Sequence, residues 1–539
     1  MDKKLNIASV PKDKLVFANR DANIKDQKFD DKPIGYFKDA WLRFCKNKAS
    51  IVAACIIICI VLFAVIVPFF NGSGNGTYAT TRYAKKVPRN LLLTNVGIAT
   101  GDVKREYNER TLINFAALGI GASSDFMNKT TVGDAINSDD PLQPITKIKK
   151  VKETSQGKNT NSIYTVKVDN YLETGFAYMD VEQSEYRAML EWQAQTGIQL
   201  IYPMIELNEY NFAVSAGLSE NANWWYKTDA KGAPVKIVKD AITGENKTVT
   251  IKYDSLDELT LVDNYMRNED GSLKFYTLSG GGTNETAMYK VRVLFYNYYR
   301  YTHNGAEPEY IFGTDSAGYD LAYRMAIGIR LSLIISICIF VINFILGTMY
   351  GAVEGYYGGS VDLILEFISY VLSGVPFMVV ATLFQIHLAA KVGPIPSLLF
   401  AFVLTGWIGT ASLIRTQFYR FKNQEYVMAA RTLGARDRRV IWKHIFPNTL
   451  GTIITSSVLA IPGVIFSESM LSYLGIINLG SSETTSLGTL LSDASGIWTS
   501  APHLMLFPAL VISLLMICFN LFGNGLRDAF NPSLRGVEE

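Results

Sequence analysis

Six apolar runs along this chain are long enough, or nearly long enough, to cross a lipid bilayer. A helix needs about 20 mainly apolar residues to span a hydrocarbon core of roughly 30 Å. Five of the runs carry no charge, and the remaining one continues past a single acid, Glu468, to residue 474. The runs are 49–70, 331–353, 367–390, 395–414, 449–466 and 504–526. The pattern predicts an all-α polytopic membrane protein with six transmembrane helices and with both termini on one side.

Basic residues beside these runs predict which side each segment faces. Arg43, Lys46 and Lys48 precede the first run, and eight Lys/Arg lie from Arg415 to Lys443, whereas none lies in 475–503. Short loops rich in Lys and Arg stay in the cytoplasm. We therefore expect the segments 1–48, 415–448 and 535–539 to be cytoplasmic and the segment 71–310 to be extracellular. The first run is too long for a signal-peptide core, so we expect it to remain as the first transmembrane helix.

Composition and charge narrow the possible functions. The chain has 539 residues, 49% of them hydrophobic, and a formal net charge of +2. Its 29 Phe and 29 Tyr exclude a disordered chain, and its near-zero charge gives no support for a nucleic-acid partner. No pattern of Cys and His predicts a metal site. No HExxH, GxSxG or GxxxxGKS/T motif occurs, so we predict no catalytic residue and no cofactor bound to this chain.

The long polar segment 71–310 has the pattern of an α+β domain. We expect a strand at 162–168, a helix at 182–196, a strand at 198–202 and a hairpin formed by 235–239 and 247–253. The Gly280–Gly282 run is expected to be a loop. About 240 residues are enough for a domain with its own core, which must form without disulfides because the segment contains no cysteine.

Two aromatic clusters in this segment each have two interpretations. Trp224, Trp225 and Tyr226 could stack on a ligand, although a role in the core is favoured. The tract Phe295–Tyr301 could contact a peptide, or it could lie at the membrane interface, where aromatic side chains gather. The whole segment could be a platform or funnel above a pore, or a packing domain that stabilises a complex.

The basic loop 415–448 contains the most specific pattern. Residues 426–433 are good helix formers, Gly434 permits a turn, and a second helix is expected at 437–445, ending at Pro447. Small residues at Ala429 and Ala430 would let a partner surface approach closely. A basic loop that only fixes the topology is the alternative, but it does not explain the arrangement of Ala429, Ala430 and Gly434.

Here the sequence resembles the permeases of ABC importers. Ala429-Ala430, then Gly434 and Pro447, match the spacing of the coupling loop in that family, and the wider segment 425–448 resembles its dipeptide and oligopeptide branch. Other blocks match in order: Gly313-Thr-Asp315 with Gly318 and Asp320, Gly328 to Leu333, Gly355 to Gly359 with Asp362, Glu468 to Gly475, Gly525 to Ala529, and Asn531-Pro532. The resemblance covers the first span and about 312–534. Met428 stands where the family usually has Glu, Tyr319 replaces a usual Arg, and Asn524 a usual Asp.

The resemblance implies a type I ABC importer permease fold in which 311–534 is the core and 71–310 is an insert between the first two helices. It implies half of a pathway for di- or oligopeptides in a bacterial plasma membrane. The implied partners are a second permease, two ABC ATPase subunits that bind the ATP, and an extracellular peptide-binding lipoprotein. The residues implied in ATPase coupling are Glu425, Met428, Ala429, Ala430, Gly434 and Pro447.

Three features within the membrane runs could belong to a pathway. Glu468 could face the pathway or make a structural helix contact, since a carboxylate in a span is costly and usually faces a cavity or a partner. Pro376 with Gly374, and Pro462 with Gly463, could expose carbonyls or be ordinary kinks. Glu366 is expected to be a solvated interfacial acid. A membrane receptor with an extracellular ligand domain is the alternative function, and a membrane hydrolase ranks last.

Overall fold

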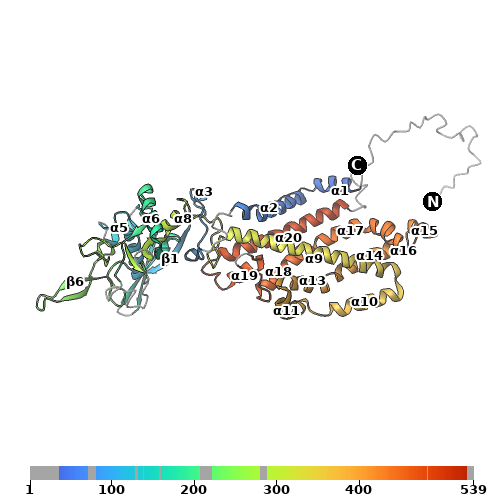
Figure 1. The fold of residues 1–539 in the computed structure, drawn as a ribbon. Helices are drawn as coiled ribbons and strands as arrows, with labels where there is room; N and C mark the ends of the chain where they lie inside the picture. The colour runs from blue at the N-terminus through green and yellow to red at the C-terminus, as the bar shows by residue number, and fades with distance from the viewer. Residues whose placement is uncertain are drawn as a thin grey trace, which may run out of the picture.

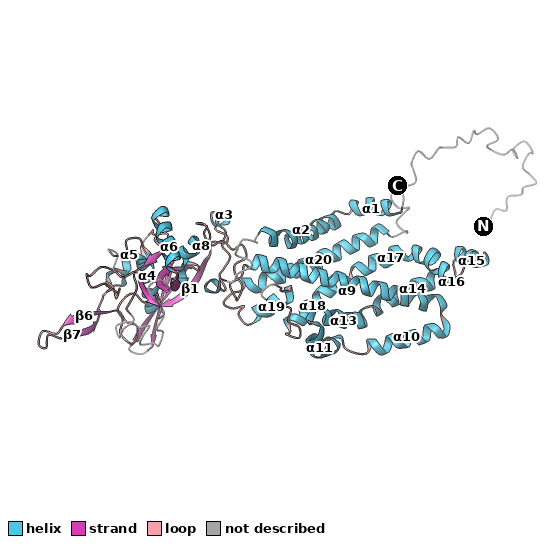
Figure 2. Ribbon diagram, viewed as in Figure 1, coloured by secondary structure: helices cyan, strands magenta, loops and turns pink. Residues whose placement is uncertain are grey.

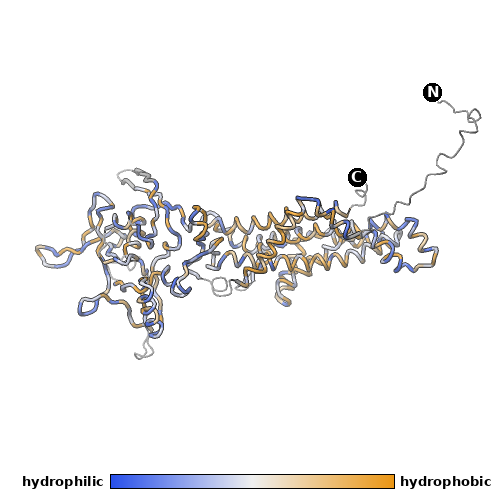
Figure 3. The backbone as a smooth tube through the Cα atoms, turned by 90° about the horizontal axis from the view of Figure 1, so that it is seen from above, coloured by the Kyte–Doolittle hydropathy of each residue, from blue (hydrophilic) through white to orange (hydrophobic). Residues whose placement is uncertain are grey.

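The computed structural model describes residues 36–70, 80–127, 131–137, 139–156, 159–206, 221–279, 288–481 and 484–530. The molecule is elongated, with a helical bundle at one end and a mixed helix and strand domain at the other (Figure 1). Its described strands all lie in the mixed domain (Figure 2). Hydrophobic residues concentrate along the bundle, whereas the mixed domain alternates between polar and apolar segments (Figure 3).

Five helical segments in the described residues are long and apolar enough to cross a membrane. They are α2 (Lys48–Phe70), α9 (Leu321–Tyr357), α13 with α14 (Pro394–Gly406 and Ile408–Phe421), the segment Asp437–Tyr473, and α20 (His503–Phe530). The pair α10 (Gly359–Ser373) and α11 (Phe377–His387) is bent by 71° and would be a sixth crossing if it spans as one unit. Shorter helices flank them: α1 (Tyr36–Lys46), α12 (Ala389–Val392) and α19 (Leu487–Ser495).

The bend between α10 and α11 lies at Gly374-Val375-Pro376. A proline disfavours helical geometry in the residue before it and removes a backbone donor. Pro376 accordingly lies outside both helices and precedes the first residue of α11. The run predicted as one span at 367–390 is therefore divided between two helices, and the bend lies at Gly374 and Pro376, for which a kink was one of the two interpretations.

Pro447 does not end a helix, contrary to the expectation from its sequence. After α16 (Asp437–Arg439) comes a π-helical turn, η6 (Val440–Ile445), which leads directly into α17 (Phe446–Val458) and α18 (Ala460–Tyr473). Pro447 lies in the first turn of α17, where a missing N–H costs little because it would be unpaired there. The π-turn changes the hydrogen-bond register before the proline, so the chain continues as one span.

Glycines let α9 lie directly against α14. A Cβ at Gly351 would come within 2.2 Å of Ala411 O, and one at Gly347 or Gly355 would meet Trp407 O or Arg415 O at 2.8 Å. The three glycines recur every fourth residue, so they form one face of α9. Small residues at such spacing permit close backbone approach between membrane helices. The α9–α14 pair is therefore a fixed contact in the bundle.

The described residues of the mixed domain, which spans 80–310, form three antiparallel sheets. The first has the order β1-β3-β2 (Asp102–Asn108, Asn159–Asp169, Ile145–Gln156). The second has the order β4-β9-β5 (Phe176–Val181, Met288–Leu294, Ile201–Tyr202), with β8 (Tyr276–Ser279) also pairing with β9. The third is the hairpin of β6 (Val235–Lys239) and β7 (Asn246–Thr250). The helices are α3 (Leu91–Thr94), α4 (Glu109–Ala122), α5 (Val132–Ile136), α6 (Gln183–Thr196) and α8 (Phe295–Thr302).

Most local predictions for this domain are confirmed. The strand at 162–168 lies within β3, the helix at 182–196 is α6, and the hairpin is β6–β7. The strand expected at 198–202 is only two residues long, as β5. Gly280–Gly282 lies outside the described residues.

The structure decides between the two interpretations of each aromatic cluster. Trp225 is buried, donates Nε1–H to Ala117 O (2.7 Å) and stacks on Tyr265, so the core role is confirmed. The membrane-interface interpretation of the second tract is wrong for Phe295 and Tyr299, because α8 buries them in the same core. The apolar sides of both clusters therefore stabilise the domain.

Two chain segments join the mixed domain to the bundle, and they pair with each other. We call residues 80–89 and 310–320 the junction. Within it, Thr314 N donates to Lys86 O (2.9 Å) and Thr80 N donates to Gly318 O (3.2 Å). Gly318 has a φ of +94°, and a Cβ there would come within 2.2 Å of Thr80 O, so glycine is required. Asp320 then accepts the N–H of Ala322 and caps α9.

A buried lysine in the junction predicts how stability depends on pH. Lys86 Nζ donates to Asn170 O, and burial lowers the pKa of Lys86 to about 8, although Glu173 and Asp169 oppose this shift. An unfolded lysine has a pKa of about 10.4, so between these values the unfolded state binds more protons and stability rises with pH. The contribution of Lys86 to the free energy of unfolding is therefore fully present above the unfolded pKa of about 10.4, and it is lost as the pH falls through about 8.

We expect the midpoint of thermal unfolding to rise from about pH 7.5 to 9.5, and this rise to be smaller in Lys86→Met. Tryptophan fluorescence of the detergent-purified chain measures it, because Trp224 and Trp225 lie in the domain core. Lys104→Met removes an exposed lysine from the same domain and is the matched control. Equal slopes in the Lys86 variant and the unsubstituted chain would contradict the assignment.

Candidate functional site

The predicted coupling loop folds as a short helix at the end of the bundle opposite the mixed domain (Figure 1). This helix, α15 (Glu425–Thr432), begins after Gln424 in extended geometry. Its last turn closes when Ala435 N donates to Ala430 O (3.0 Å) and Gly434 N donates to Arg431 O (2.9 Å). Gly434 has a φ of +80° and open space around its Cβ position. Glycine is thus needed here for backbone geometry, as the sequence predicts, and not for a close contact within this chain.

The α15 helix is attached firmly to the C-terminal end of α9. Val427 is buried in a cluster with Tyr356, Phe418, Val440 and Ile445. Tyr356 Oη donates to Asp437 Oδ1 (2.5 Å), and the Arg431 guanidinium lies 4.9 Å from the centre of the Tyr356 ring. Side-chain packing, a charge-assisted hydrogen bond and a cation–π contact therefore act on one tyrosine of α9. These contacts link α15 to α9 and to the segment that starts at Asp437.

The opposite side of α15 is exposed in the described part of the chain. We call Glu425, Met428, Ala429 and Leu433 the α15 surface, because all four are exposed. Leu433 is 88% exposed and Met428 51% exposed, which is unusual for large apolar side chains at a folded helix end. Exposed apolar residues grouped in this way mark a site of protein contact.

The six residues predicted for ATPase coupling do not all share this surface. Glu425, Met428 and Ala429 do, and Gly434 follows directly. Ala430 is buried against the chain itself, so its small size serves packing inside the permease. Pro447 lies apart, on α17. Consecutive helical residues are rotated by about 100°, which is why Ala429 and Ala430 face opposite ways.

An ion-pair cluster that sequence analysis missed lies close to this site. Arg415 on α14 binds two carboxylates of α10: its Nη2 lies 2.8 Å from Asp362 Oδ2, and its Nη1 lies 2.8 Å from Glu366 Oε1. Glu354 of α9 is buried and lies 3.5 Å from Arg415 Nε. Tyr419 Oη also donates to Asp362 (2.7 Å). The expectation that Glu366 is merely a solvated acid is wrong, because it shares a bidentate arginine.

A cavity of about 410 Å³ lies between the membrane helices. It is lined from α9, α11, α13, α14 and α18 by Phe340, Asn343, Phe377, Phe402, Thr405, Gly406, Thr410, Ala460, Gly463, Val464 and Ser467. None of these side chains is charged. The amide oxygen of Asn343 has no hydrogen-bond partner in the structure, although Asn343 is mostly buried. A wall of hydroxyls, one amide and aromatic rings suits a flexible polar solute better than an ion.

Neither predicted pathway residue lines this cavity directly. Pro376 lies next to Phe377, which does. Glu468 is fully buried, and its carboxylate accepts hydrogen bonds from Ser332 (3.0 Å) and Ser472 (3.0 Å). Ser332 lies on α9, so this carboxylate joins α9 to α18. The geometry favours the structural alternative for Glu468, whereas its neighbour Ser467 faces the cavity.

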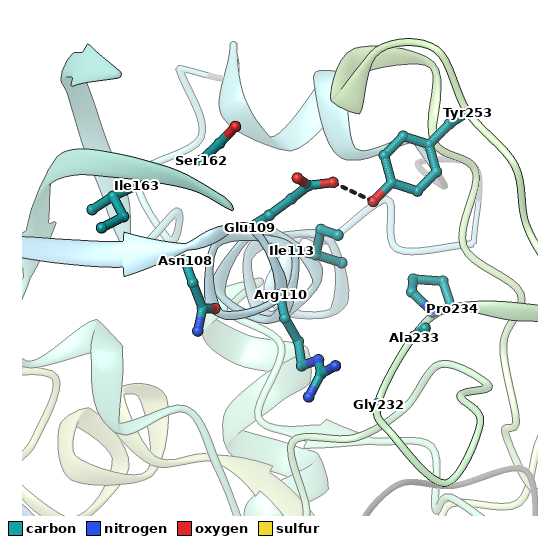
Figure 4. Close-up of a pocket in the computed structure, with 10 residues that line it drawn as sticks. All are labelled: Asn108, Glu109, Arg110, Ile113, Ser162, Ile163, Gly232, Ala233, Pro234 and Tyr253. Atoms are coloured by element: carbon teal, nitrogen blue, oxygen red, sulfur yellow. Dashed lines mark hydrogen bonds between the residues drawn. The ribbon is translucent and has the colours of Figure 1, made fainter. Parts of the chain in front are cut away.

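A second cavity, of about 490 Å³, opens in the mixed domain at the start of α4 (Figure 4). Asn108, Glu109 and Arg110 line it from one side, and Gly232 to Pro234 from the other. Tyr253 closes one edge by donating its hydroxyl to the Glu109 carboxylate. The cavity thus has a fixed polar rim.

Comparison with known proteins identifies relatives of the bundle. Residues 343–536 match the family described as binding-protein-dependent transport system inner membrane component, and residues 35–86 match the N-terminal TM domain of oligopeptide transport permease C. The two matches leave residues 87–342 between them.

Three curated relatives have similar identities. The oligopeptide transport system permease protein OppC of Bacillus subtilis is 39% identical over 225 residues, which is 42% of this chain and 72% of that protein. The dipeptide transport system permease protein DppC of the same organism is 40% identical over 42% of this chain and 69% of its own length. OppC of Haemophilus influenzae is 42% identical over 42% of this chain and 72% of its own length. The relatives do not favour the receptor alternative.

Among solved structures, an inward-facing conformation of the MetNI methionine ABC transporter is 12% identical. It aligns with 39% of this chain and 97% of its own at a TM-score of 0.33, which carries no argument on its own.

Proposed function

This chain belongs to the family of permease subunits of oligopeptide and dipeptide ABC transport systems, and we propose that it forms half of the translocation pathway for di- or oligopeptides. The resemblance stated from the sequence is thereby confirmed. The partners that we propose are a second homologous permease, two ABC ATPase subunits that bind ATP, and an extracellular peptide-binding lipoprotein. The single observation that supports the coupling role is the exposed α15 surface, whose helix is anchored to α9.

The chain is a multi-pass protein of the bacterial inner membrane. Beyond this, we propose six crossings, with α10 and α11 counted as one, cytoplasmic termini and an extracellular segment 71–310. The basic loop 415–448 and the absence of Lys and Arg from 475–503 support this orientation. A C-terminal tag that is reached by protease in intact cells would contradict it.

For the coupling step, we propose that the α15 surface docks in a groove of one ATPase subunit. Closure of the two ATPases on ATP would then move α15. Because Val427 and Tyr356 tie α15 to α9, the movement would reach the helices around the 410 Å³ cavity. The cavity would open to one side of the membrane and then to the other.

We propose that the 410 Å³ cavity forms this chain's wall of the pathway, and Gly463 offers a test. No atom lies within 4 Å of a Cβ added at Gly463, which lines the cavity, so Gly463→Phe should fill space without a clash. We expect peptide uptake to fall by about tenfold or more, equivalent to a barrier increase of about 1.4 kcal/mol. Uptake into proteoliposomes of the complete complex measures it.

Gly409→Phe is the matched control, because Gly409 is also a helical glycine with open space but does not line the cavity. ATPase activity and thermal stability should be unchanged in both variants. Normal uptake by Gly463→Phe would contradict the proposal that this cavity is part of the pathway.

The composition of the complex provides the direct test of the proposed function. A tag on this chain should co-purify two ATPase chains and a second permease, and a loaded binding protein should stimulate ATP hydrolysis. Recovery of this chain without an ATPase, from gentle detergent and with all candidate subunits co-expressed, would contradict it.

A further inference from the structure

An uncharged loop in the mixed domain exposes five large apolar side chains. The apolar loop, residues 91–98, presents Leu91, Leu92, Leu93, Val96 and Ile98 to the surroundings. Leu92 is 81% exposed and Val96 74% exposed. The sequence contains no charged residue between Arg89 and Asp102. Such a cluster is costly in water, so its exposure requires an explanation.

The apolar loop has a defined shape. Asn90 N donates to Ala99 O (2.9 Å), which closes the base of the loop. The Asn90 side chain accepts the N–H of Leu93 (3.0 Å) and caps α3, and Thr94 Oγ1 donates to Asn90 O (2.7 Å). Polar groups at the base therefore satisfy the backbone, and the apolar side chains are left on the outside.

The base of this loop is joined to the part of the chain that enters the bundle. Arg89 and Tyr310 exchange both backbone hydrogen bonds (2.9 Å each), and Leu91 N donates to the Glu309 carboxylate (2.6 Å). Only two residues beyond Tyr310, the Phe312 ring packs on Phe507 of α20, with centroids 4.7 Å apart. Phe312 also contacts Phe63 of the first span, at 6.3 Å.

These contacts set the height of the loop relative to the membrane. Phe63 and Phe507 belong to helices apolar enough to span a bilayer, so Phe312 lies at the outer part of the bundle and the apolar loop lies just beyond it. Figures 1 and 2 show α3 at the edge of the mixed domain that faces the bundle, near the end of α2. Ile311, in the junction, is also exposed and apolar, and so is Phe69 near the end of α2.

We propose that the apolar loop inserts into the outer leaflet and anchors the mixed domain on the phospholipid surface. Leu92 and Val96 would enter the boundary between headgroups and acyl chains, where apolar faces reach depths of roughly 5–10 Å. Arg82, in the short 3-10 helix Thr81–Tyr83, and Lys85, in the turn after it, are both exposed and would lie at the level of the lipid phosphates. The proposal depends on the membrane location of the bundle and not on the cargo.

Two observations favour lipid over a protein as the occupant. The surface is a narrow turn of eight residues, whereas a stable protein interface needs roughly 800 Å² from each partner. The base of the apolar loop is also hydrogen-bonded to Glu309 and Tyr310, and the chain from Tyr310 reaches the apolar bundle through Phe312. A fluid leaflet can cover a convex turn, which a preformed protein groove would have to match in shape.

An environment-sensitive fluorophore can test this location. The five native cysteines are first replaced by serine, and an NBD group is attached at Leu92→Cys in the full chain, in nanodiscs of phosphatidylethanolamine and phosphatidylglycerol. We expect blue-shifted NBD emission and quenching by phospholipids that carry a nitroxide near the headgroup. Ile242→Cys is the matched control, because Ile242 is 95% exposed but lies in the turn after β6, away from the bundle (Figure 1).

A second pair of samples separates lipid from protein contact. With NBD at Ile98→Cys, introducing Leu92→Glu and Val96→Glu should abolish the nitroxide quenching, and the fold should survive because both positions are exposed. Water-like emission at Leu92→Cys in nanodiscs would overturn the proposal. So would a blue shift that appears only after the second permease or the binding lipoprotein is added.

Discussion

We expect that replacing Ala429 with arginine abolishes peptide uptake, while the chain still inserts in the membrane and folds. Ala429 is exposed on the proposed docking face, and a long charged side chain there would hold the ATPase away from Met428 and Leu433. Apolar side chains at the centre of an interface supply most of its binding energy, and truncating such a residue typically costs about 2 kcal/mol or more. A charged side chain among them should therefore prevent the ATPase from binding, and not merely slow ATP hydrolysis.

Uptake in proteoliposomes and co-purification of the ATPase measure this effect together. Ala390→Arg introduces the same side chain at another exposed alanine, within α12, and should leave both readouts unchanged. Leu433→Ser should weaken ATPase retention in the same direction. If Ala429→Arg transported normally, the α15 surface would not be the docking site.

Removing the Arg415 side chain should cause the largest loss of stability. In Arg415→Met, the carboxylates of Glu354, Asp362 and Glu366 lose their shared cation, and Glu354 is almost fully buried. Removing one partner from a buried ion pair costs about 3–5 kcal/mol. Because Arg415 is partly exposed, we expect about 3 kcal/mol, near the lower end of that range. A thermal shift of the detergent-purified chain measures it.

Three variants distinguish this effect from the simple loss of a positive charge. Arg420→Met removes an exposed arginine five residues away and should have little effect. Arg415→Lys should be intermediate, because a lysine cannot bind two carboxylates with a planar fork. Adding Asp362→Asn and Glu366→Gln to Arg415→Met should recover part of the loss. If Arg415→Met unfolded at the same temperature as Arg420→Met, the cluster would not be a stabilising unit.

The sequence was sufficient to locate the membrane runs and α15. An uncharged run of about 20 residues has few alternatives to a bilayer span, and Gly434 marks a turn that other residues adopt only with strain. Local chemistry also predicted the β6–β7 hairpin and α6. The order of short motifs was specific enough to identify the family, which the relatives confirm.

The remaining features depend on which helices meet in three dimensions. Asp362 and Glu366 lie one turn apart on α10, a visible signal, but their partner Arg415 is about 50 residues away on α14. Nothing in the sequence around Glu468 indicates that Ser332 of α9 binds its carboxylate. Pro447 was misjudged because a π-turn, which has no clear sequence signature, precedes it. The burial of Ala430 and exposure of Ala429 likewise follow only from how α15 packs.

The continuity of α9 has a consequence for how turnover could be observed. It is one unbroken helix of 37 residues, about 55 Å long at 1.5 Å per residue. One end is capped at the junction with the mixed domain, and the other carries Tyr356 beneath α15. If α9 moves as one rigid helix, a small rotation at the α15 end displaces the mixed domain at the other end by a larger distance. A dye attached at the tip of the β6–β7 hairpin would therefore move further than α15 itself, and its displacement would follow single transport cycles.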